Sequence, residues 1–155
     1  SQVTAFVQTA RLSYPSSSIR DADRWIFGTG YAYAFKSGEI VYGSIYGGKE
    51  NALADNVPHL SHRPVGVRLG MEKALSGKLM AFGMLSYEDR RYGGQEPFFN
   101  SARHDQQSSL TLGVHYQIKD NLRLTPQISY TDNHSNVIIY DFQRVAASAT
   151  LRMSF

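Results

Sequence analysis

The sequence predicts an all-β protein: an antiparallel transmembrane β-barrel with eight strands in this chain. Three observations lead to this prediction. Apolar and polar residues alternate with a period of two through most of the chain, the connections between these segments are long and short in turn, and the chain ends on an aromatic residue, Phe155. A period of two indicates strands, because successive side chains of a strand point to opposite faces.

Alternation is clearest in the last segment, residues 144–155. One row is apolar, and the other is small or polar, as expected for the closing strand of an outer-membrane barrel. The apolar row is Val145, Ala147, Ala149, Leu151, Met153 and Phe155. The end of this row resembles the C-terminal signal that the barrel assembly machinery recognises, so Leu151, Met153 and Phe155 are predicted to act as an assembly signal.

Composition limits the classes of protein. With 155 residues, of which 42% are hydrophobic, the chain is predicted to form one domain, 1–155, as a single domain or as the C-terminal portion of a larger barrel. No segment approaches the ~18–20 apolar residues of a membrane-spanning helix. The absence of cysteine excludes disulfides and thiolate ligands. Lys and Arg are scattered and the net charge is only +3, so no nucleic-acid partner is expected.

Seven connections separate the eight predicted strands. The first strand has apolar residues in both rows, which a bulge would reconcile. The third does not reveal which of its faces is the lipid face, and Pro126 in the seventh lacks a ladder donor. The strands are 2–14, 25–36, 40–47, 65–72, 79–90, 109–118, 122–131 and 144–155; the long loops are 15–24, 48–64, 91–103 and 132–141; the short turns are 37–39, 76–78 and 119–121.

A soluble lipocalin-like barrel also has eight alternating strands, but its apolar row faces inward. The sorted loops favour the membrane barrel, because its extracellular loops are long and its periplasmic turns short. Aromatic residues near the predicted strand ends also favour the membrane barrel, because membrane proteins carry aromatic girdles at the interfaces. These residues are Trp25, Phe35, Tyr116, Tyr130 and Phe155. The lipid-facing residues are predicted to include Trp25, Tyr31, Leu112, Val114, Leu124 and Leu151. Glycine and alanine are frequent in the other row, which suits a crowded or open lumen.

Polar side chains in the proposed lumen rows are the candidate functional residues. They form either a structural network of ion pairs and hydrogen bonds or a polar wall past which a substrate moves. The structural network is favoured, because buried charges must find partners whatever the function. The lumen-facing candidates are Arg68, Glu72, His115, Gln117, Arg123, Gln127 and Arg152.

Candidate catalytic and metal-binding motifs are weak. In a strand, the neighbours His104 and Asp105 point to opposite faces, and so do His134 and Ser135 unless they lie on a turn. His59 and His62 lie three apart, but no carboxylate or cysteine completes a ligand set. We therefore predict that the protein is not an enzyme and has no catalytic residue, cofactor or metal.

Several segments in the second half of the chain combine residues in a distinctive way: 88–94 (EDRRYGG), 97–99 (PFF) followed by 103–105 (RHD), 124–130 (LTPQISY) and 133–144 (NHSNVIIYDFQR). These segments resemble the C-terminal barrel of the surface lipoprotein assembly modifier family. The resemblance is good from Arg63 to Phe155 and loose in the first strands.

This resemblance implies a location in the outer membrane of a Gram-negative bacterium. Family members place a tetratricopeptide-repeat domain ahead of a barrel larger than eight strands and help to move lipoproteins or other proteins to the cell surface. The implied partners are outer-membrane lipids, the barrel assembly machinery and lipoprotein or protein cargo. This chain has no helical repeats and fewer strands, so it is either the C-terminal portion of such a protein or a small stand-alone barrel.

Three functions remain open at this point. The first is part of a translocation channel for lipoproteins or other proteins, the second a stand-alone structural or adhesive barrel, and the third, least favoured, a lipid-modifying barrel enzyme. A tetratricopeptide domain encoded upstream of Ser1 would distinguish the first from the second.

Overall fold

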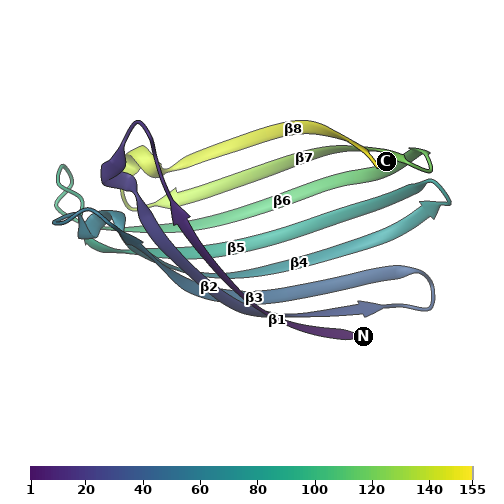
Figure 1. The fold of residues 1–155 in the computed structure, drawn as a ribbon, viewed down its shortest axis with the longest axis horizontal. Helices are drawn as coiled ribbons and strands as arrows, with labels where there is room; N and C mark the ends of the chain where they lie inside the picture. Colours follow the sequence, from purple (N-terminus) through teal and green to yellow (C-terminus); the bar gives the residue numbers. More distant parts are fainter. Residues whose placement is uncertain (155) are drawn as a thin grey trace.

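The computed structural model describes residues 1–154, which form one curved antiparallel sheet (Figure 1). No helix in this part of the chain is long and apolar enough to cross a membrane. The elements are β1 (Gln2–Leu12), η1 (Ser18–Arg20), β2 (Ala22–Ala34), β3 (Glu39–Ala52), η2 (Pro58–Leu60), β4 (His62–Ser76), β5 (Leu79–Gln95), β6 (Ala102–Lys119), β7 (Leu122–Ser135), η3 (Ile138–Tyr140) and β8 (Phe142–Met153).

Each strand pairs with the next in the chain, in the order β1 to β8. All four long connections lie at one end of the sheet, and the short turns lie at the other end together with both chain ends (Figure 1). The predicted eight antiparallel strands and their alternating connections are therefore confirmed. The strands run further than predicted toward the long loops: β6 begins at Ala102, so the loop before it is only 96–101.

The sheet is open. β1 pairs only with β2 and β8 only with β7, so each outer strand leaves one edge without a partner among residues 1–154. β1 follows β2 along its whole length, at the edge of the sheet opposite β8 (Figure 1). Such long edges carry unpaired N–H and C=O groups that favour pairing with a further strand.

The sequence predicts two local irregularities, a bulge in the first strand and a break in the ladder at Pro126. The predicted bulge in the first strand is wrong, because the register from Gln2–Ala32 to Leu12–Ala22 is unbroken. Both apolar rows of β1 are real, and they lie on opposite faces of the sheet. Pro126 does interrupt the ladder: pairing of β6 with β7 is lost between Gly113–Gln127 and Tyr116–Leu124, and resumes in the same register.

The register divides the side chains of the strands into two faces. The apolar face carries Trp25, Ile45, Leu112 and Leu151, each about half exposed or more. It also holds Val41, Gly43, Ile45 and Gly47, which settles the undecided row of the third strand. All six residues predicted to face lipid lie on this face: Trp25, Tyr31, Leu112, Val114, Leu124 and Leu151.

The buried residues of the sheet lie on its polar face. Every buried residue within a described strand belongs to it: Ala22, Tyr46, Glu50, Pro64, Gly66, Gly70, Asp105, Thr131, Asn133 and Ser135. A soluble barrel buries its apolar row and exposes its polar row. This sheet has the opposite arrangement, so its large apolar surface has no covering layer among residues 1–154.

Candidate functional site

All seven residues that the sequence placed in the lumen rows lie on the polar face. Only some of them contact one another or another side chain of the polar face. Arg123 Nε donates a hydrogen bond to Gln117 Oε1 at 3.1 Å, and His115 Nδ1 lies 3.0 Å from Thr125 Oγ1 beside the gap at Pro126. Arg68 lies over the Tyr46 ring, 4.6 Å from its centroid. The other three candidates are Glu72, Gln127 and Arg152, and within residues 1–154 no hydrogen bond or ion pair joins them to one another.

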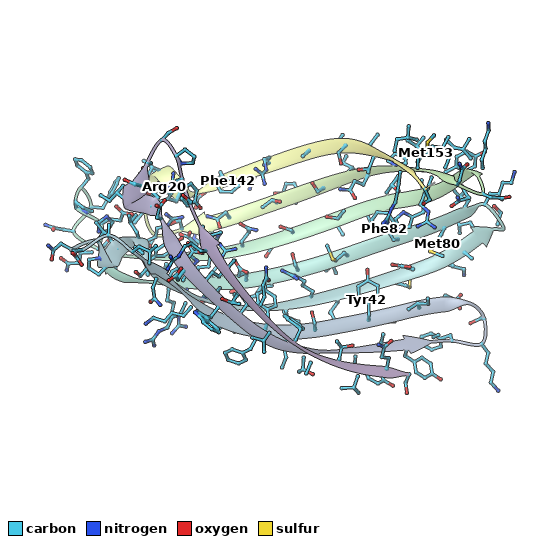
Figure 2. All side chains as sticks on the ribbon, viewed as in Figure 1. Arg20, Tyr42, Met80, Phe82, Phe142 and Met153 are labelled. Carbon is cyan, nitrogen blue, oxygen red and sulfur yellow. The ribbon has the colours of Figure 1, made fainter. Side chains whose placement is uncertain are left out.

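Glycines on the polar face have a specific packing role. Four of them are each covered by an aromatic ring from the residue directly opposite on the preceding strand. A Cβ atom on Gly113 would lie 2.5 Å from the ring of Phe82, and those on the other glycines would lie about as close (Figure 2, where Tyr42 and Phe82 are labelled). The pairs are Phe6–Gly28, Tyr46–Gly66, Tyr42–Gly70 and Phe82–Gly113. These glycines therefore make room for rings laid flat across the strands.

A polar network occupies the polar face at the end of the sheet that carries the long loops. Its centre is Asp105, which is 0% exposed. Arg103 donates to both carboxylate oxygens at 2.6–3.0 Å, and its guanidinium also lies over two rings, 3.3 Å from the centroid of Tyr140 and 4.4 Å from that of Tyr92. Burial acts to lower the pKa of Arg103, but the hydrogen bonds from this guanidinium to Asp105 raise it overall, so the charge is retained.

Arg90 extends this network across three strands. Its Nη2 donates to Gln107 Oε1 at 3.0 Å and to Asn133 Oδ1 at 2.7 Å, and lies 3.9 Å from the Asp105 carboxylate. Asn133 is fully buried and donates to the carbonyl of Tyr140 at 2.6 Å. The network thereby fixes η3 and the β7–β8 loop to the polar face.

A second group of contacts lies on the β2–β4 side. The Arg24 guanidinium lies 2.5 Å from Glu50, whose other carboxylate oxygen is 4.0 Å from His62 Nδ1. The His62 ring stacks on Tyr92, with centroids 4.8 Å apart. Burial lowers the pKa of His62 and raises that of Tyr92, so both groups are held neutral at pH 7.

The alternation of apolar residues in the sequence does not identify most of this network. Arg24, Glu50, Arg90, Asp105 and Asn133 all fell in or near predicted loops, because the apolar alternation ends before them. The period of two nevertheless continues in polar residues: in 103–109, every second position belongs to the polar face. Both rows of 103–109 are polar, however, so hydropathy gives no signal for this period in the sequence.

The His motifs do not form the pairs that nucleophilic catalysis needs. His104 lies on the apolar side with Nε2 2.5 Å from Asp89, while Asp105 lies on the polar face. His134 Nδ1 lies 2.9 Å from Asp141, whereas the Ser135 hydroxyl accepts a bond from the Val137 N–H. His59 lies in η2, and His62 contacts Tyr92. That the protein is not an enzyme stays a prediction.

The apolar face is bounded along each strand. Beyond its apolar residues, at the end with the long loops, the same face carries charged and polar residues: Arg11, Asp23, Lys49, Arg63, Asp89, Arg91, Gln106 and His134. In β5 to β8 the apolar rows cover 79–87, 110–118, 122–130 and 145–153. Each spans about nine residues, close to the ~9–11 of a tilted membrane-crossing strand. Tyr87 and Tyr130 lie at one limit of this band and Tyr116 near the other.

The last strand carries the predicted assembly signal. Leu151 and Met153 lie on the apolar face of β8 and are 63% and 51% exposed. Phe155 lies outside the described residues.

The described strands form an antiparallel meander whose buried residues lie on the polar face and whose apolar face is exposed and bounded. The walls of membrane barrels are sheets of this type. Comparison with protein families matches the model described as "Surface lipoprotein assembly modifier" over residues 1–155. The chain therefore belongs to the surface lipoprotein assembly modifier family, and the match includes the first strands, where the sequence resemblance was loose. Family and fold are consistent with an outer-membrane location. No curated protein and no solved structure matches the chain.

Proposed function

We propose that residues 1–155 form part of the wall of an outer-membrane β-barrel that moves lipoproteins or other proteins to the bacterial cell surface. The observation that carries this proposal is the inverted arrangement of the sheet: its buried strand residues lie on the polar face, and its bounded apolar band is exposed. Lipid covers such a band without a further protein layer, whereas in water the same band would drive aggregation.

The open edges support a barrel with more strands than the eight described. Within lipid, unpaired N–H and C=O groups cost several kcal/mol each, so membrane sheets close on themselves. Among residues 1–154, β1 and β8 each offer a free edge along their whole length. We propose that further strands of the same protein join these edges, and that the polar face then lines a lumen through which cargo passes.

Site-specific photo-crosslinking in cells tests the cargo route. A crosslinking residue at Thr111 faces the lumen of the proposed barrel, and one at Leu112 faces lipid. In the full-length protein, expressed with a surface lipoprotein, Thr111 should capture the lipoprotein during assembly and Leu112 should not. Equal capture at both positions, or unchanged surface display of the lipoprotein without the protein, would contradict the proposal.

The barrel assembly machinery is the second proposed partner. The apolar row of β8, which includes Leu151 and Met153, offers this machinery an apolar edge strand. A stand-alone structural or adhesive barrel is the alternative function. It requires β1 and β8 to pair with each other, and a disulfide placed between these strands would form only in that arrangement.

A further inference from the structure

Three cations lie side by side on the apolar side of the sheet, just beyond the apolar band. Arg63 of β4 is directly opposite Arg91 of β5. The β3–β4 register, which pairs Gly47 with Val65 and Glu50 with His62, places Lys49 opposite Arg63. All three are exposed. Cross-strand neighbours have Cβ atoms about 4.5–5.5 Å apart, and like charges at this separation destabilise a sheet.

The charges in this row are only partly balanced. Asp89 lies 3.1 Å from Arg91 and 2.5 Å from His104, so one carboxylate serves two partners. Within residues 1–154, neither Lys49 nor Arg63 has an ion-pair partner. An anion placed over the row would relieve the repulsion.

A cavity of about 930 Å³ lies at this row. The β3–β4 loop forms one wall, because η2 packs against the end of β5, where the Gly93 N–H donates to the Ser61 carbonyl at 2.9 Å. Lys49, Arg63 and Arg91 line the polar part of the cavity, and Val65 and Tyr87 line its apolar part.

An apolar groove continues from the cavity along the sheet. The next cavity, of about 680 Å³, shares Val65, Tyr87 and Asp89 with it, and a third, of about 570 Å³, shares Ile45 and Val67 with the second. Gly47 and Gly43 of β3 lie along this groove. A Cβ atom on Gly47 would meet nothing closer than 3.7 Å, so this glycine, unlike those under aromatic rings, leaves open space.

We propose that this groove binds one phosphorylated lipid of the outer leaflet, with its phosphate over Lys49, Arg63 and Arg91 and an acyl chain along Gly47 toward Gly43. The inference rests on the proposed membrane location, with the long loops outside. Charge complementarity selects the head group, and the position of the cations just beyond the band places them at the depth of lipid phosphates.

Thermal unfolding of the full-length protein in phosphatidylcholine bicelles, titrated with lipid A, tests this site. A ligand that binds the folded state raises the unfolding midpoint. The K49Q/R63Q double variant should bind lipid A at least about tenfold more weakly than the wild type does. Gly47→Leu, which fills the groove, should also weaken the binding of lipid A. Two controls should bind as the wild type does: Arg11→Gln, because Arg11 already pairs with Asp23 at 2.9 Å, and Ala147→Leu on β8.

Each outcome has a separate meaning. If the wild type fails to insert into phosphatidylcholine bilayers, the proposed membrane function is wrong. If it inserts but lipid A raises the midpoint no more than added phosphatidylcholine does, or equally in all variants, the lipid site is wrong. A triacylated peptide without phosphate that competes as well as lipid A would also overturn the site, because the occupant would then be a lipoprotein anchor.

Discussion

The buried carboxylate of Asp105 offers a sharp test of the polar network. Replacing it with alanine removes the acceptor of three hydrogen bonds from Arg103, at 2.6, 2.9 and 3.0 Å. The Arg103 side chain is 15% exposed, so little water can replace the lost partner. Removing one partner of a buried ion pair typically costs about 3–5 kcal/mol. The Tyr140 and Tyr92 rings remain over the guanidinium and keep the expected loss of unfolding free energy near the lower value, about 3 kcal/mol.

Asp23→Ala is the matched control. Arg11 makes two hydrogen bonds to this carboxylate as well, at 2.9 and 3.1 Å, but that pair is exposed to solvent. Exposed pairs contribute little, because water and salt screen them. Urea unfolding of the full-length protein in detergent should therefore show a much larger loss for Asp105→Ala than for Asp23→Ala. Equal losses would mean that the network is solvated and does not fix the long loops.

Glu39, Gly66 and Phe155 can be tested separately. A hydrogen bond from Ser37 and, to a smaller extent, one from Lys73 lower the pKa of Glu39 from 4.5 to about 2. The stability that comes from this lowered pKa is complete above pH 4.5 and is lost as the pH falls through about 2. Ser37→Ala should therefore raise the pKa of Glu39 in an NMR titration. Gly66→Val should lower the unfolding free energy by about 1–3 kcal/mol, because the tyrosine ring over it must move. Deleting Phe155 should reduce outer-membrane assembly in cells more than Leu112→Ala does at matched stability in detergent; equal defects would mean that Phe155 has only a packing role.

Much of the fold could be predicted because apolar residues recur at every second position through most of the strands. The residues of the apolar face follow from the period of two, and the number of strands and the positions of the turns follow from the connections between the alternating segments. Strand ends could not be predicted: hydrogen-bonded ladders continue into polar sequence, as in 102–108 of β6, and backbone pairing leaves no trace in hydropathy. The two rows of β1 looked like an error in the pattern, but Phe6 belongs on the polar face, where it covers Gly28.

The candidate site was predicted only in part, for a similar reason. Arg123 and Gln117 could be recognised because they lie in regular alternation, and they do contact each other. Asp105 is bonded to Arg103, two residues away in β6, but it also lies 3.9 Å from Arg90 of β5, and the Arg103 guanidinium lies over Tyr140 in the next loop. Such pairing between separate strands and loops is set by register, which a single sequence does not contain.

In the proposed barrel, the apolar face contacts lipid and the polar face does not. Neighbouring residues on β8, Ala147 on the apolar face and Ser148 on the polar face, test it at nearly the same depth, and both are exposed and small. Arginine on the lipid face near the midplane costs about 2–4 kcal/mol. Refolding of the full-length protein into bilayers should show this loss for Ala147→Arg and a much smaller loss for Ser148→Arg. Equal losses, or a larger loss for Ser148→Arg, would contradict the account.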